Sequence, residues 1–205
     1  ETDTGSLSVL PGSVKRGYVA GGWYRLVDTG GWPKNTFGSI ISVASSYNKR
    51  TGVTTTSTRA QLLWLSSAEN TLGGTGWRLK SSYNLSTTDG SSLWQPFTCP
   101  GTVGATGSNP KCGRYTWTGV LQERDLAGIW VPTTAYGSGG TVTYTVTVYD
   151  GGALTSCTKR ICKTTELADW FGLTIVGVTA PTGALDAVPQ VGVPARLRNG
   201  SIKVF

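Results

Sequence analysis

Thr141-Val-Thr-Tyr-Thr-Val-Thr-Val-Tyr149 is the stretch that decides the fold class of this 205-residue chain, because its side chains alternate strictly in character. Apolar and aromatic residues fill the even positions from Val142 to Val148, and threonine fills the odd positions before Tyr149. A period of two is typical of a β-strand with one face in the core and the other in water. Turn signals at 137–140 and 150–152 bound the stretch, so the chain is expected to be built from strands.

Further strands are expected on both sides of this stretch, separated by turn-rich segments at irregular intervals. The run at 61–65, Gln-Leu-Leu-Trp-Leu, is apolar almost without a break, which favours a strand buried on both faces. Many short strands with such spacing predict an all-β fold, a jelly-roll or immunoglobulin-like β-sandwich that forms one domain over 1–205. The other expected strands are 39–44, 76–80, 115–121, 173–178 and 201–205.

At most one short helix is expected, at about residues 164–172. Thr164 or Thr165 would cap its N-terminus, Leu167 and Trp170 would face inward, and Gly172 would end it. Long turn-rich loops are expected at 28–37, 70–76, 89–112 and 180–193. Loops longer than about 12 residues in a compact domain are usually functional or disordered.

The chain contains no histidine, and this absence excludes several classes of enzyme. Serine–histidine and cysteine–histidine nucleophiles need an imidazole base, and the common catalytic zinc sites need at least one histidine ligand. No catalytic residue, metal site or cofactor is therefore predicted. Glu123 and Asp125 form the one close carboxylate pair in a turn, and they are the candidates for a glycoside hydrolase.

Four cysteines form two pairs that are close in sequence. Cys99 and Cys112 bracket a loop rich in Gly, Pro and Thr, and Cys157 and Cys162 bracket Thr-Lys-Arg-Ile. Zinc sites prefer C-x₂₋₄-C clusters, and the first spacing is too wide for one. Two local disulfides are therefore predicted, which places the protein in an oxidising compartment and implies that it is exported.

A net charge of +7, from 18 Lys and Arg against 11 Asp and Glu, suits a partner with acidic groups. The basic residues are spread along the chain, with no helical stripe or RNA-binding aromatic signature, so an ordinary solvated face explains them as well. In an exported protein, an anionic patch on a protein or glycan is the expected partner, and nucleic acid is not. No apolar run of 18 residues occurs, so no membrane span is expected.

Asp125, Leu126, Gly128 and Trp130 form the pattern D-L-x-G-x-W between a strand-like stretch and the alternating stretch at 141–149. The whole segment 115–149 resembles the late part of receptor-binding domains in two-domain tip adhesins of bacterial chaperone–usher pili. The resemblance implies a jelly-roll-like sandwich with binding loops at one end, exposed at a pilus tip on the cell surface. It also implies that a pilin domain, which contacts the other pilus subunits, continues after Phe205.

The chain departs from the mannose-binding branch of these adhesins, whose domain begins with an aromatic residue and a nearby cysteine. Here the chain starts at Glu1, and the first cysteine is Cys99. The pattern is more similar to adhesins of the type 3 fimbrial or Acinetobacter pilus kind, which recognise host matrix or plasma glycoproteins such as fibrinogen. A host glycoprotein or its glycan is therefore the expected ligand. A jelly-roll capsid-type structural protein and a glycoside hydrolase are the alternatives.

Candidate ligand-binding residues combine cations with aromatic rings. Arg78 and Lys80, followed by Tyr83, are expected to line a cationic pocket for a carboxylate or sulfate. The alternative is a strand whose Trp77 and Leu79 face the core while its two cations are solvated on the other face. Trp94 lies in turn-rich sequence, where a ring is available to stack on a sugar or anchor a protein hot spot.

Two further places repeat this combination. Trp32 stands in a glycine-rich loop close to Lys34, and the ring and the cation are both candidates for ligand binding. Between the last two cysteines, Lys159 and Arg160 predict either a basic binding tip or the solvated end of a hairpin.

Overall fold

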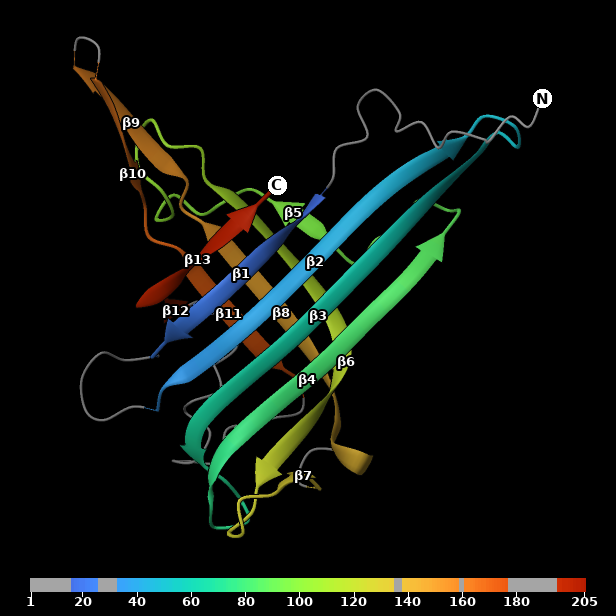
Figure 1. The fold of residues 1–205 in the computed structure, drawn as a ribbon, viewed down its shortest axis with the longest axis vertical. Helices are drawn as coiled ribbons and strands as arrows, with labels where there is room; N and C mark the ends of the chain where they lie inside the picture. The colour runs from blue at the N-terminus through green and yellow to red at the C-terminus, as the bar shows by residue number, and fades with distance from the viewer. Residues whose placement is uncertain (1–15, 26–32, 135–137, 159–160, 177–194) are drawn as a thin grey trace.

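One antiparallel sheet of eleven strands curls into two facing layers and builds the fold (Figure 1). The computed structural model describes residues 16–25, 33–134, 138–158, 161–176 and 195–205. A second sheet of two strands forms a hairpin that projects from the body. Within the described ranges, the one helical element is a single 3-10 turn, Ser138–Gly140, so the prediction of an all-β fold is confirmed.

The large sheet has the strand order β12-β11-β8-β6-β4-β3-β2-β1-β13. In chain order its main strands are β1 Arg16–Tyr24, β2 Asn35–Asn48, β3 Val53–Glu69, β4 Thr75–Thr87, β6 Lys111–Arg124, β8 Thr141–Asp150, β11 Trp170–Ile175, β12 Ala195–Arg196 and β13 Asn199–Val204. Two short strands, β5 Gln95–Phe97 and β7 Trp130–Pro132, also pair with β6. The projecting hairpin consists of β9 Ala153–Thr158 and β10 Ile161–Glu166.

Strand β6 lies where the sheet turns from one layer into the other. It pairs with β8 along Lys111–Val120 but with β4 only along Val120–Glu123. In Figure 1, β1–β4 form the front layer and cross over β6, β8 and β11 behind them. At the opposite side, β13 pairs with β1, and the Val204 N–H donates to the Asp150 carboxylate at 3.0 Å. The two layers are thus joined at both sides.

Side chains alternate between the core and the solvent along nearly every long strand. In β8 the even positions from Val142 to Val148 are buried, as its sequence predicts. The prediction that residues 61–65 are buried on both faces is wrong, because Leu62 and Trp64 are buried while Leu63 is exposed. A sandwich of two layers has no third layer to cover the outer face of β3, so that face meets water.

The predicted helix at 164–172 is also wrong. Thr164 and Thr165 belong to β10, and Trp170 already begins β11. The threonines are β-branched and suit a strand, and Thr155 of β9 and Thr164 bring their hydroxyls to 3.2 Å across the hairpin. The strand predicted at 173–178 therefore begins three residues earlier than expected.

Both disulfides are local, as predicted. Cys99 is bonded to Cys112 and Cys157 is bonded to Cys162. The second bond joins directly opposite residues of β9 and β10, and an isolated two-stranded hairpin is marginally stable in water without such support. Two disulfides indicate an extracellular or periplasmic protein.

A cluster of aromatic side chains fills the space between the layers. The Tyr18 hydroxyl bonds to Ser39, and its ring lies 6.3 Å from that of Tyr115 in the other layer. Further along, Phe37 stacks on Phe171 at 3.8 Å between ring centroids. Burial raises the pKa of Tyr18 well above its ordinary value, so the hydroxyl stays protonated and able to donate.

Trp94 belongs to this core, although the sequence predicts an accessible ring in a loop. It is 6% exposed, and its ring lies 5.4 Å from that of Tyr18. Gly113 of β6 makes the space, since a Cβ atom there would overlap the Trp94 ring. The Trp94 ring therefore packs against Gly113 and Tyr18 in the core.

Gly113→Ala is expected to lower the free energy of unfolding by about 1–3 kcal/mol, because the added methyl overpacks the core against Trp94. Urea denaturation followed by tryptophan fluorescence measures the change. Gly38→Ala is the matched control, because a Cβ at that strand glycine meets nothing within 4 Å. Equal stability of the two variants would contradict the role given to Gly113.

Candidate binding groove on the outer face of the sheet

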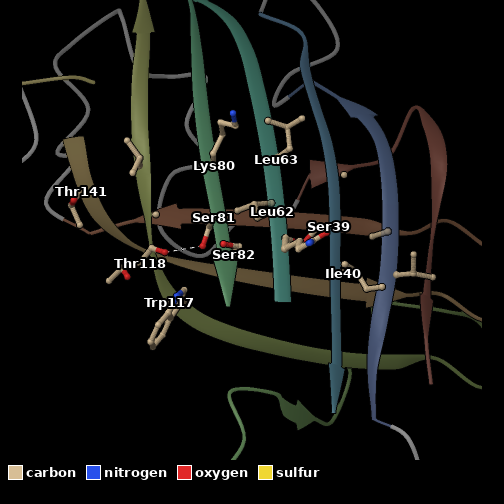
Figure 2. Close-up of a pocket in the computed structure, with 16 residues that line it drawn as sticks. Ser39, Ile40, Leu62, Leu63, Lys80, Ser81, Ser82, Trp117, Thr118 and Thr141 are labelled. Carbon is tan, nitrogen blue, oxygen red and sulfur yellow. Dashed lines mark hydrogen bonds between the residues drawn. The ribbon is translucent and has the colours of Figure 1, made fainter. Parts of the chain in front are cut away.

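An open groove crosses the outer face of β1, β2, β3, β4 and β6, with a cavity volume of about 780 Å³. Figure 2 shows side chains of these strands converging on it. We call this hollow the sheet groove. Its lining residues are Val19, Ala20, Gly38, Ser39, Ile40, Gln61, Leu62, Leu63, Lys80, Ser81, Ser82, Trp117, Thr118, Gly119, Val120 and Thr141.

Two glycines create the hollow at its β1–β2 end. Gly21 and Gly38 are directly opposite each other in the register of these strands. Both occupy positions whose side chains would point away from the core, and a Cβ at Gly38 would enter open space. The sheet surface is therefore bare backbone at this point, between the side chains of Ile40 and Leu63.

An apolar stripe runs along the floor and rim of the sheet groove. It consists of one outward-pointing residue from each of four strands: Val19 (48% exposed), Ile40 (39%), Leu63 (43%) and Val120 (38%). Lys80 of β4 lies between Leu63 and Val120 in the register, so the stripe is apolar on both sides of one cation. Single exposed apolar residues are ordinary, but several that share one hollow make it a candidate place for a ligand or partner.

An ammonium and several hydroxyl groups lie within and beside this stripe. Lys80 lies directly opposite Leu63, and Figure 2 shows the two side chains projecting beside each other. The hydroxyls of Ser82, Thr118 and Thr141 line the same hollow. Within the part of the chain that the structure describes, the Lys80 ammonium has no ion-pair or hydrogen-bond partner. The groove thus combines an apolar surface with an available cation and hydroxyl groups.

A hydrogen bond closes the sheet groove where β4 and β6 separate. Beyond Lys80 and Val120 the two strands diverge, and the Ser81 hydroxyl donates to the Thr118 carbonyl at 2.7 Å. On the inner side of the same gap, Tyr83 and Trp117 meet edge to face, with ring centroids 4.4 Å apart. These contacts replace the missing ladder bonds and keep the groove from opening into the core.

Of the predicted cationic pocket, only Lys80 lies in the sheet groove. Arg78 is on the same face of β4, but its Nε donates to Gln122 at 2.9 Å and its guanidinium lies 4.5 Å from the Trp130 ring centre. Tyr83 points to the opposite face, toward the core and Trp117. Residues 78, 80 and 83 therefore do not line one pocket, because an odd spacing along a strand reverses the side of the sheet.

The other predicted site residues lie elsewhere. Lys34 places its ammonium 5.0 Å from the ring centre of Trp23, away from the groove. Trp32, Lys159 and Arg160 fall outside the described residues.

Sequence reasoning missed the apolar part of the groove. Ile40, Leu63 and Gly38 have the character of ordinary strand residues, and only the register shows that they meet. One pattern in the sequence could have indicated the groove. Ile40 and Leu63 are apolar residues at outward strand positions, where polar residues are expected.

The carboxylates Glu123 and Asp125 are occupied by structural bonds. Buried Glu123 accepts hydrogen bonds from the Thr133 hydroxyl and, at 2.9 Å, from the Thr71 N–H. Asp125 accepts from the Ile129 N–H at 2.8 Å and shapes a turn. Neither side chain points at a common bond, so the predicted hydrolase pair does not form.

The D-L-x-G-x-W pattern is likewise a structural turn. The Gly128 N–H donates to the Asp125 carbonyl, and Gly128 has a φ of +83°, which a side chain rarely allows. The turn delivers Trp130 to β7, where its ring supports Arg78.

Comparison with protein-family models, with curated proteins and with solved structures found no match for this chain. No group of three or more potential metal ligands occurs among the described residues, and no helix among them is long and apolar enough to cross a membrane. The sheet groove is thus the candidate site for a ligand or partner among the described residues.

Arg78→Ala is expected to destabilise the fold by about 1 kcal/mol, because the variant loses a hydrogen bond and a ring contact that hold β4, β6 and β7 together. Lys80→Ala, two residues away on the same face, should change the free energy of unfolding by less than about 0.5 kcal/mol. Paired urea denaturation curves test this. A larger loss for Lys80→Ala would show that its ammonium has a structural partner.

Proposed function

We propose that this chain is the ligand-binding domain of an exported adhesin, of the kind found at the tip of chaperone–usher pili. It binds a host glycoprotein, or the glycan on it, and carries out no chemical reaction. The observation that supports this most is the sheet groove, an exposed apolar hollow that also offers the uncommitted ammonium of Lys80. The resemblance of segment 115–149 to these adhesins supports the same function.

The composition of the groove suits a glycoprotein segment. The stripe of Val19, Ile40, Leu63 and Val120 can cover the apolar side of a peptide or the apolar face of a sugar ring. Lys80 can pair with a carboxylate or sulfate, and the hydroxyls can bond to polar groups at the rim. The net charge of +7 favours approach by an acidic partner.

The alternatives find less support in the described residues. A glycoside hydrolase needs two carboxyl groups that flank one bond, and Glu123 and Asp125 serve as a buried anchor and a turn residue instead. A capsid-type protein commonly gathers its basic residues in a tail, whereas here they are spread along the chain. The two disulfides also fit an exported protein better than a cytoplasmic assembly.

The ligand class can be found with a glycan array run beside binding assays on fibrinogen, collagen and fibronectin. Gly38→Leu is then expected to weaken binding at least tenfold, about 1.4 kcal/mol, because the new side chain fills the hollow. Gly101→Leu is the matched control. A Cβ at Gly101 also meets nothing within 4 Å, but this residue lies outside the groove, in the loop closed by the Cys99–Cys112 disulfide. Equal binding by both variants would place the ligand elsewhere.

Lys80→Glu is expected to weaken binding by more than Lys80→Ala, because charge reversal adds repulsion to the loss of a favourable pair. Raising the salt concentration should weaken the wild type and leave Lys80→Ala less affected, since exposed charges are screened within about 8 Å at physiological ionic strength. Surface plasmon resonance at several salt concentrations measures both effects. If Lys80→Glu binds as strongly as the wild type, the Lys80 ammonium takes no part in ligand binding.

A further inference from the structure

Strand β4 has a free edge along its C-terminal half. It pairs with β3 as far as Thr87, but its pairing with β6 ends at Lys80. Between Ser82 and Thr87, the edge of β4 that faces away from β3 forms no backbone hydrogen bond with any residue that the structure describes. Figure 1 shows this part of β4 as the outermost strand of the front layer, with β6 turned away behind it.

The register identifies the unpaired groups. The Ser67 N–H donates to the Lys34 carbonyl, so odd residues of β3 bond to β2 and even residues bond to β4. Even residues of β3 lie opposite odd residues of β4, for example Ala60 opposite Tyr83. The N–H and C=O groups of the even residues, 82, 84 and 86, therefore point outward from the edge.

Nothing in the sequence of this edge protects it. Residues 81–87, Ser-Ser-Tyr-Asn-Leu-Ser-Thr, contain no charge and no proline, and their register with β3 is regular. Proteins usually protect a free edge with lysine, proline, a bulge or a very short strand. At another end of the sheet, β12 is only two residues long and ends on Arg196. An exposed strand of this length without such protection is a place for another strand to pair.

We propose that two copies of this chain pair antiparallel through the free edge of β4, about a two-fold axis at Asn84. This register places Ser82 opposite Ser86 of the second copy and Asn84 opposite its own equivalent, so each outward backbone group finds a partner. On the inner face it places Tyr83 opposite Leu85, which is 48% exposed in the single chain. Both faces of the new pairing are therefore chemically matched.

The side chains along the edge favour a second copy over an unrelated strand. In the antiparallel arrangement, the exposed Ser82 and Ser86 face each other twice on the outer face, and the Tyr83 ring faces the exposed Leu85 twice on the inner face. Cross-strand pairs of side chains that hydrogen-bond or pack together stabilise a sheet. The segment is therefore complementary to itself when the direction of the strand reverses.

Association is measured by light scattering after size-exclusion chromatography over a dilution series. The wild type is expected to reach twice the monomer mass of 21.5 kDa at high concentration. Asn84→Pro is expected to stay monomeric and folded, because it removes an outward N–H while Tyr83 and Leu85 keep the bonds to β3. Asn84→Ser, which retains the N–H, is the control and should dimerise like the wild type.

The register is tested by cross-linking. Asn84→Cys is expected to form a disulfide-linked dimer on mild oxidation, because equivalent residues on the axis have Cα atoms about 5.5 Å apart. Ser82→Cys should not, since it lies opposite residue 86. Amide hydrogen exchange adds a direct readout, with protection of residues 82, 84 and 86 rising with concentration.

Three results would overturn the proposal: a wild type that is monomeric at every concentration, a dimer that survives Asn84→Pro, or equal cross-linking of the two cysteine variants. Protection of these amides only by a foreign peptide would assign the edge to a different partner and would also overturn it.

Discussion

The divergence of β4 from β6 beyond Lys80 and Val120 is the constraint on which the rest of the structure depends. Because β6 leaves β4 to pair with β8, the sheet turns into a second layer and encloses an aromatic core. The same divergence forms the end of the sheet groove, where Ser81 bonds to Thr118, and it leaves the far half of β4 paired with β3 alone among the described residues. Core, groove and free edge are thus three results of one change of partner.

At the other end of the β4–β6 pairing, a buried carboxylate is satisfied by hydrogen bonds from neighbouring loops. Glu123 is buried at the end of the β4–β6 pairing, where the Thr71 and Thr133 side chains and a backbone N–H bond to its two oxygens. A buried carboxylate without such donors would cost several kcal/mol. Its hydrogen bonds fix β6 and the two loops beside it, and they hold the Glu123 carboxylate away from that of Asp125.

Period-two alternation made the all-β fold, the β8 faces and the inward side chains of Trp77 and Leu79 predictable from sequence. The two disulfides were also predictable, because the cysteines of each pair are close in sequence. The sites were harder, because they depend on which strands become neighbours. The sequence predicts an accessible Trp94 ring, but Gly113 of another strand leaves the space that buries it. The sequence also groups Tyr83 with Arg78, but the odd spacing places their side chains on opposite faces of β4. The groove residues Gly38 and Leu63 come from different strands, and no local pattern joins them.

Alternation also separates the two tasks of each strand. In β2 the buried Phe37, Ser39 and Ile41 hold the layers together, while Gly38 and Ile40, interleaved with them, face outward into the groove. Substitutions at the outward positions leave the packing untouched, so sequence variation can reshape the groove without loss of the fold. For the proposed adhesin function, receptor choice can therefore change on one scaffold, through substitutions at alternate residues of the front strands that carry little thermodynamic penalty.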